Sequence, residues 1–275
     1  MSEVSRTIAP MSAVRRAWLR ELGVERVWGG GSVAQAPEPV SAPVAAVQEI
    51  RVEAAQVEAQ EATLPAVAAD VIVNVPEIVA KGEIDPDQAW AILQQEISGC
   101  VACGLCKGRT QTVFGVGVMR ARWMVIGEAP GEQEDLQGIP FVGRSGKLLD
   151  SMLAAVGHSR EKDVFIANVI KCRPPGNRDP SPEEVAACSP YLMRQIALVR
   201  PDMILVVGRF AAQTLLGSDA KIGSLRGQRH EVTVDGRKIP VVVSYHPAYL
   251  LRSPQEKTKA WQDLRLAVTV GAGAA

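Results

Sequence analysis

The stretch WMVIGEAPGEQED, residues 123–135, decides how this chain is expected to fold. Its first five residues form a short, uninterrupted apolar run, which is the pattern of a strand buried on both faces. The turn GEAPG follows directly, and its glycines and proline mark the end of the strand. A buried strand of this kind favours a parallel sheet covered by helices, in which functional groups gather at the carboxyl ends of the strands.

Strand and helix patterns alternate through the rest of the body. Three more strands are expected, in VFIANVI (164–170), MILVVG (203–208) and IPVVVSYH (239–246). Helical patterns separate them, including one that a Ser181/Glu184 capping box opens and a last one over residues 255–268. The alternation predicts an α/β fold with three α/β/α layers around a central four-stranded parallel sheet.

Two segments of different composition precede this body, which we expect to span residues 85–270. Residues 29–84 are rich in Ala, Val, Glu and Pro and contain no aromatic residue. They bury too little apolar surface to offset their ordering entropy, so we expect a disordered linker. Residues 1–28 carry apolar side chains at helical spacing. We expect a short amphipathic helix there, which either docks on a protein partner through residues 11–28 or folds back on the body.

The net charge of zero conceals an uneven distribution. Residues 100–275 carry 23 Lys and Arg against 16 Asp and Glu, whereas residues 29–98 carry two basic residues against eleven acidic ones. A basic body suits a polyanion such as nucleic acid, although a surplus of this size also occurs on ordinary solvated surfaces. The sequence has neither a long apolar run nor a secretory signal pattern, so we expect a soluble, cytoplasmic protein without membrane contact.

Five cysteines stand out: Cys100, Cys103, Cys106, Cys172 and Cys188. In a reducing cytosol, clustered cysteines indicate a metal site or catalysis more often than disulfides. Cys100 and Cys103 form one close pair. Cys172 and Cys188 form a second pair, which bridges the end of a predicted strand to the following helix. Two pairs can close a four-thiolate site, with Cys106 as the spare. Thiolates suit either an iron–sulfur cluster or a structural zinc ion.

Taken together, these stretches resemble the family 4 uracil-DNA glycosylases, the iron–sulfur branch of the uracil-DNA glycosylase superfamily. The resemblance covers residues 88–268 and rests on CVAC, GEAPGEQED, GIPFVG, NVIKCRPPGNR, Cys188 and HPAYLLR, in that order. It implies an α/β/α fold, excision of uracil from DNA, and a [4Fe–4S] cluster. The family pattern matches Cys100, Cys103, Cys172 and Cys188 as cluster ligands and requires no thiol at position 106.

The resemblance also implies roles for single residues at the strand ends. Glu128 and His246 are expected to be catalytic. The Glu128 carboxylate would orient or activate the attacking water or stabilise the cationic sugar, unless it only caps the following turn. His246 would donate a hydrogen bond to uracil O2 as negative charge develops there.

Three residues are expected to bind the extracted base. Phe141 matches the residue on which uracil stacks, and Glu134 matches a position near the uracil 5-carbon, where it would disfavour the methyl group of thymine. The carboxamide of Asn168 can pair with uracil N3–H and O4 at once, unless it only bonds loop backbone. Asp135 is expected to be exposed.

Contacts to DNA are expected from two loops. Arg173 and Arg178 are candidate phosphate ligands, although solvated loop arginines are the alternative. Leu250, Leu251 and Arg252 look like the family's DNA-penetrating segment, which fills the space left by the extruded nucleotide. The cluster itself is expected to be structural, since hydrolysis of an N-glycosidic bond needs no electron transfer.

The sequence therefore predicts a monomeric, monofunctional uracil-DNA glycosylase of base excision repair, which releases uracil from uracil-containing DNA and leaves an abasic site. One alternative is a superfamily variant that stays covalently attached to abasic DNA. That variant carries a histidine-bearing insertion after the Phe motif, and GIPFVGRSGKLLDSML has none. The other alternative is a non-catalytic DNA-binding module that uses the cluster only for folding.

Overall fold

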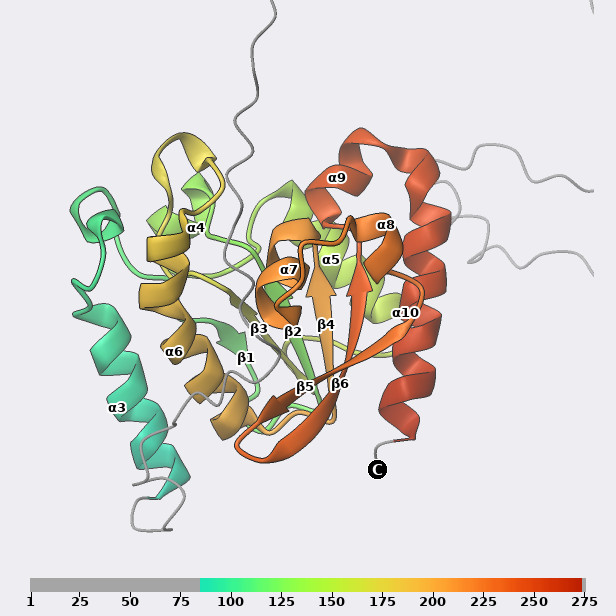
Figure 1. Ribbon diagram of the computed structural model, residues 1–275, viewed down its shortest axis with the longest axis horizontal. Helices are drawn as coiled ribbons and strands as arrows, with labels where there is room; N and C mark the ends of the chain where they lie inside the picture. Colours follow the sequence, from blue (N-terminus) through green and yellow to red (C-terminus); the bar gives the residue numbers. More distant parts are fainter. Residues whose placement is uncertain (1–84, 274–275) are drawn as a thin grey trace, which may run out of the picture. The chain divides into compact units, whose positions relative to one another are not determined.

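The computed structural model describes residues 85–273, which are drawn in colour in Figure 1. The helix predicted within residues 1–28 and the linker predicted for residues 29–84 lie outside the described residues. Among the described helices, none is long and apolar enough to cross a membrane.

Six strands form one mixed sheet in the order β1-β3-β2-β4-β6-β5. The strands are β1 (Val116–Gly117), β2 (Trp123–Gly127), β3 (Val164–Asn168), β4 (Met203–Val207), β5 (Arg229–Val234) and β6 (Arg237–Ser244). The four central strands β3, β2, β4 and β6 run parallel to one another, and β1 and β5 are antiparallel edge strands. The four predicted strands are thus present and parallel, but the sheet is a mixed one of six strands, because the prediction omits both edges.

The two edge strands were missed for different reasons. β1 is only two residues long, too short for any periodicity to show. β5 alternates exposed and more buried residues and joins β6 through Asp235 and Gly236, both of which have positive φ. An Asp-Gly pair in this conformation is the usual two-residue hairpin turn, so the sequence did hold a signal for β5.

Eight α-helices and three short 3₁₀ segments occur in the described part of the chain. The α-helices are α3 (Pro86–Ser98), α4 (Glu132–Gln137), α5 (Arg144–Ala155), α6 (Pro182–Val199), α7 (Arg209–Leu216), α8 (Ile222–Leu225), α9 (Pro247–Arg252) and α10 (Lys257–Ala272). The 3₁₀ segments are η1 (Gly104–Lys107), η2 (Pro175–Asn177) and η3 (Pro254–Glu256). The predicted capping box at the start of α6 is confirmed, because the Ser181 side chain accepts from the Glu184 amide and the Glu184 side chain accepts from the Ser181 amide.

Helices cover both faces of the sheet, as Figure 1 shows. Met124 and Ile126 of β2 point into a core shared with α6 and α7, whereas Trp123 and Val125 point into a second core shared with α5, α9 and α10. Every residue of the short strand β2 is thus buried. This is why the strand reads as a continuous apolar run.

The four parallel strands all end at the same edge of the sheet, at Gly127, Asn168, Val207 and Ser244. Gly127 of β2 lies directly beside Asn168 of β3 in the strand register. Segments far apart in the sequence therefore meet at this edge, and most of the predicted site residues follow these strand ends.

Candidate functional site

His246 and Phe141 lie face to face at this edge. Their ring centroids are 5.6 Å apart, and the ring planes differ by 29°. His246 is the N-cap of α9, and its Nδ1 accepts a hydrogen bond from the Ala248 amide at 3.1 Å. This bond requires an unprotonated Nδ1, which leaves Nε2–H as the donor of a neutral imidazole. Burial, and then the charge of Arg252, lower the pKa of His246 to about 4.

Asn168 offers a buried acceptor without a partner. The residue is 2% exposed, and among the described residues its Oδ1 has no hydrogen-bond donor. A Cβ on Gly127 would lie 2.5 Å from this oxygen and 2.6 Å from the Phe141 ring, so only glycine leaves room for both groups. A buried unpaired carbonyl oxygen costs about 1–3 kcal/mol. The arrangement indicates an acceptor kept free for a donor on a ligand.

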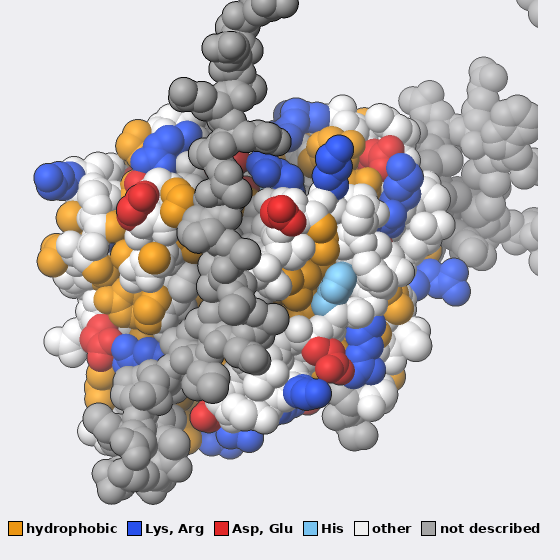
Figure 2. Space-filling model, viewed as in Figure 1, with side chains coloured by type: hydrophobic (Ala, Val, Ile, Leu, Met, Phe, Trp, Pro, Cys, Tyr) orange, Lys and Arg blue, Asp and Glu red, His pale blue; other side chains and the backbone are white. Residues whose placement is uncertain are grey.

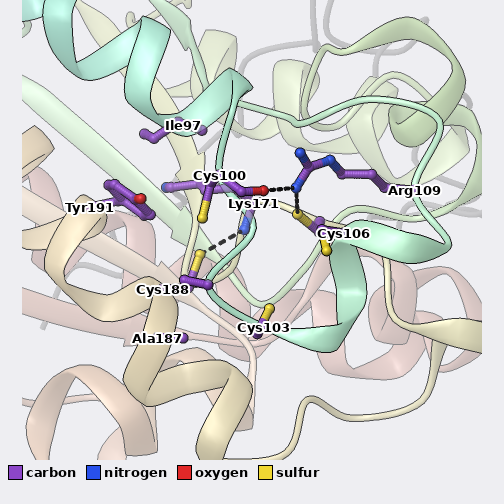
Figure 3. Close-up of a pocket in the computed structure, with 11 residues that line it drawn as sticks. Ile97, Cys100, Cys103, Cys106, Arg109, Lys171, Ala187, Cys188 and Tyr191 are labelled. Atoms are coloured by element: carbon purple, nitrogen blue, oxygen red, sulfur yellow. Dashed lines mark hydrogen bonds between the residues drawn. The ribbon is translucent and has the colours of Figure 1, made fainter.

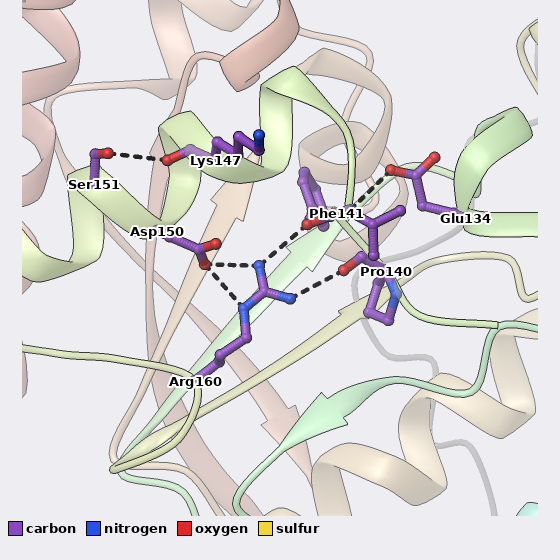
Figure 4. A network of polar contacts seen from close by, with 8 residues as sticks. Glu134, Pro140, Phe141, Lys147, Asp150, Ser151 and Arg160 are labelled. Carbon is purple, nitrogen blue, oxygen red and sulfur yellow. Dashed lines mark hydrogen bonds and ion pairs between the residues drawn. The ribbon is translucent and has the colours of Figure 1, made fainter. Parts of the chain in front are cut away.

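Phe141 has a strained backbone that several contacts hold in place. Its φ of 55° lies in the left-handed region, which costs a non-glycine residue about 1–3 kcal/mol. Arg160 donates to the carbonyl oxygens of Pro140 and Phe141 at 3.2 Å each, and Asp150 anchors the guanidinium at 2.7 Å (Figure 4). Gly146 lets α5 approach, because a Cβ there would collide with the Phe141 carbonyl oxygen.

Glu134 holds the same loop from its other end. Its Oε1 accepts a hydrogen bond from the Val142 amide at 3.1 Å, directly after Phe141 (Figure 4). Its charge also acts on His246, where it opposes the fall in pKa. The structure therefore brings Glu134 to the predicted base pocket and shows it supporting the loop that carries the Phe141 ring.

Glu128 follows β2 and is half-buried. Burial, aided by the negative charge of Asp179 and opposed by Arg209, raises the pKa of Glu128 to about 7. A carboxyl group with such a pKa can take up or release a proton near neutral pH, as a general base requires.

A second site lies where the chain runs on from β3 to helix α6. All five cysteines line one cavity, and Arg109, Lys171 and Tyr191 also border it (Figure 3). Cys172 and Cys188 are buried, whereas the three cysteines of residues 100–106 are half-buried. Within residues 85–273, no three His, Cys, Asp or Glu side chains form a group that could hold a single metal ion.

Two hydrogen-bond donors face the sulfur atoms of this cavity. Arg109 donates from Nη1 to Cys172 Sγ at 3.3 Å and to the Cys100 carbonyl oxygen at 2.8 Å, and the Lys171 amide donates to Cys188 Sγ at 3.3 Å (Figure 3). Burial nevertheless raises the pKa of Cys188 to about 11 and also raises that of Cys172. Thiolates at these two positions therefore require additional positive charge, such as a bound metal supplies.

The residues predicted to contact DNA differ in how exposed they are and in the contacts they already make. Leu250 is 1% exposed and belongs to the core, so it cannot enter DNA while α9 stays packed. Leu251 is half-buried and Arg252 is exposed, at the same end of α9. Arg178 forms a bidentate pair with Glu184 at 2.9 and 2.6 Å, which engages it at the start of α6. Arg173 bonds Asn177 at 2.8 Å.

Figure 2 shows Lys and Arg side chains along the upper edge of the displayed face, where the parallel strands end in Figure 1. A polyanion would meet positive charge at this edge of the sheet.

Three residues of the site had no predicted role, or the wrong one. Arg160 lies in a turn far from any motif, and nothing in the sequence connects it to Phe141. Lys171 lies inside the quoted stretch NVIKCRPPGNR, where a lysine directly after an apolar strand is itself a signal. Asp135, expected to be exposed, is 3% exposed and accepts the Thr110 amide on both oxygens at 3.0 Å, which ties α4 to the cysteine segment.

Comparisons with known proteins agree with this geometry. The family model of the uracil DNA glycosylase superfamily matches residues 114–265. A type-4 uracil-DNA glycosylase of Archaeoglobus fulgidus is 47% identical over 175 residues, which cover 62% of this chain and 87% of that protein. Its counterpart from Saccharolobus solfataricus is 44% identical over 179 residues, 63% of this chain and 82% of that protein. A third, from Thermotoga maritima, is 42% identical over 168 residues, with coverages of 61% and 85%.

Proposed function

The chain belongs to the type-4 uracil-DNA glycosylases, and we propose that it hydrolyses the N-glycosidic bond of deoxyuridine in DNA, releasing uracil and leaving an abasic site for base excision repair. The observation that carries the proposal is the free, buried Oδ1 of Asn168 beside the Phe141 ring and a neutral His246. A base inside a duplex cannot reach such a pocket, so the nucleotide is flipped out of the stack.

Asn168 accounts for the choice of base. Its Oδ1 accepts uracil N3–H, while its amide group donates to uracil O4. Cytosine presents an acceptor at N3, which would face the Asn168 oxygen and leave two acceptors in contact. Sites that pair with a polar group in this way discriminate by about 10⁴ or more, because the wrong base leaves buried polar groups unpaired.

His246 stabilises the leaving group. Negative charge develops on uracil O2 as the glycosidic bond breaks, and Nε2–H of a neutral imidazole donates a hydrogen bond to it. The neutral form is available at physiological pH because burial holds the pKa of His246 near 4. The bond from Ala248 fixes the tautomer in advance, so no reorganisation is needed during the reaction.

Glu128 is proposed to orient the attacking water, to accept its proton, and to stabilise the cationic sugar of an oxocarbenium-like transition state. The ionised carboxylate performs each of these roles. With a pKa of about 7, a large part of Glu128 is ionised at neutral pH.

The cysteine cavity fits a [4Fe–4S] cluster held by Cys100, Cys103, Cys172 and Cys188. These four thiols share one cavity with an arginine and a backbone amide directed at two of the sulfur atoms. Zinc is the alternative for four thiolates, and membership of the type-4 family favours the cluster. When bound, the cluster supplies a cross-link between the segment before η1 and helix α6.

We further propose that Arg173, Leu251 and Arg252 contact DNA beside the pocket, whereas Arg178 contributes only if DNA displaces it from Glu184. The monomeric state, the cytoplasmic location and a protein partner for residues 11–28 remain predictions from the sequence.

Uracil release tests the proposal. Purified protein is incubated with a synthetic oligonucleotide that carries one uracil, and with matched oligonucleotides that carry thymine or cytosine there. We expect free uracil and an alkali-labile abasic site from the first oligonucleotide alone. Binding without release would favour a non-catalytic DNA-binding module, and a protein–DNA adduct that survives denaturation would favour the covalently attached variant.

A further inference from the structure

Lys171 has no role in the proposed chemistry. It is nevertheless buried, with only 1% of its surface exposed, which is unusual for a lysine. Its Nζ donates to the backbone carbonyl oxygen of Asn168 at 2.7 Å and to Oε1 of Gln195 at 2.6 Å. None of the ion pairs found between residues 85 and 273 includes it. A buried ammonium without a carboxylate partner is costly and calls for another source of negative charge.

The cysteine cavity is that source. Lys171 lines the cavity, its amide donates to Cys188 Sγ at 3.3 Å, and Cys172 is the next residue. Cysteines that ligate a metal are thiolates, and four thiolates around a cluster form a strongly anionic group. Lys171 therefore borders a site that becomes negatively charged when the cluster is bound.

At its other end, Lys171 holds the segment that carries the uracil-recognising side chain. β3 ends at Asn168, and the ammonium returns three residues along the chain to bond the carbonyl oxygen of that residue. Gln195 connects the same ammonium to helix α6, and its own amide group donates to the Phe114 carbonyl oxygen at 2.8 Å. Lys171 thus borders the cysteine cavity and also bonds the backbone of Asn168.

We propose that Lys171 is a positioning residue that couples the cysteine site to uracil recognition: its ammonium holds the Asn168 backbone, and the thiolates of the cluster balance its charge. The inference rests on the proposed function of Asn168. The cluster is then more than a cross-link, because the net negative charge of the cluster together with its four thiolates would stabilise the ammonium that bonds Asn168. Removing the ammonium should impair excision while DNA binding persists.

A double-mutant cycle tests whether Lys171 acts through Asn168. Single-turnover uracil excision at saturating DNA, and DNA affinity, are measured for wild type, Lys171→Met, Asn168→Ala and the double variant. We expect Lys171→Met to lower the excision rate about tenfold or more, since a charged hydrogen bond is lost, with DNA affinity nearly unchanged. In the Asn168→Ala background the same substitution should cost about twofold or less, because its target is already absent. Lys162→Met, at an exposed lysine, is the matched control.

The absorbance of the cluster provides a readout independent of activity. Loss of the cation should speed the bleaching of Lys171→Met by an iron chelator, and Lys162→Met should bleach like wild type.

If Lys171→Met does not fold, Gln195→Leu serves the same cycle, since it removes one of the two acceptors that hold the ammonium. Its smaller loss of rate should likewise vanish in the Asn168→Ala background. Fully additive losses in the cycle would overturn the inference and leave Lys171 with a role in folding alone. Failure of the wild-type protein to release uracil would instead overturn the proposed function.

Discussion

The backbone amide of Ala248 donates a hydrogen bond to Nδ1 of His246 at 3.1 Å, and so determines which imidazole nitrogen carries the proton. The bond is part of the N-cap of α9, with Pro247 in the first turn of that helix. The sequence His-Pro-Ala that follows β6 therefore determines the tautomer of His246 as well as the start of α9.

Replacing His246 tests this donor. We expect His246→Ala to lower the single-turnover excision rate by about 10²- to 10³-fold, the usual effect of removing a donor to a developing anion. His246→Gln, which keeps an amide donor, should retain more activity than the alanine variant, while both bind DNA as wild type does. Equal rates for wild type and His246→Ala would remove this residue from the mechanism.

The pH dependence of kcat/KM should report Glu128. Its carboxylate is the active form and its pKa is about 7, so kcat/KM should rise as the pH increases through about 7 and then level off. His246 is already neutral above about pH 4, so it should add no second inflection near neutrality. Glu128→Gln should lower the rate and abolish the inflection. A wild-type profile that is flat between about pH 5 and 9 would contradict this assignment.

We expect Arg160 to affect excision by holding Phe141 in position. Without the guanidinium, two carbonyl oxygens lose their donor and the left-handed backbone of Phe141 loses its support. We expect Arg160→Met to lower kcat/KM by about tenfold and to lower the melting temperature by several degrees, since about 1–2 kcal/mol is lost. Arg265→Met, at an exposed arginine, is the control. Loss of stability with unchanged kcat/KM would show that Arg160 does not position the ring.

A substitution of Cys106 tests which four of the five cysteines hold the cluster, because Cys106 lines the same cavity as the four proposed ligands. Cys106→Ser should keep the visible absorbance of the iron–sulfur cluster, whereas Cys172→Ser or Cys188→Ser should lose it together with solubility. Iron content per chain, measured alongside, checks the interpretation. Equal loss of absorbance in all three variants would make Cys106 a ligand and overturn the assignment.

Sequence patterns were informative where a structure depends on neighbours in the chain. The strand β2 could be predicted because all five of its residues are buried and therefore apolar. The start of α6 could be predicted because the Ser181/Glu184 capping box lies within four consecutive residues. Leu250 was misplaced because HPAYLLR does not show which face of α9 meets the core. Arg160 and Lys171 gain their roles from contacts that only the folded chain creates, with a carbonyl oxygen 19 residues away in one case and with helix α6 in the other.

Excision by wild type and Asn168→Ala, measured side by side on one uracil-containing oligonucleotide at saturating concentration, tests the central claim most directly. The Oδ1 of Asn168 is a buried acceptor that no donor among the described residues reaches, so its removal should lower the release of uracil by about 10²-fold or more while the affinity for DNA persists. Release of uracil by Asn168→Ala at the wild-type rate, with unchanged discrimination against cytosine, would contradict the account and assign base recognition to other residues of the pocket.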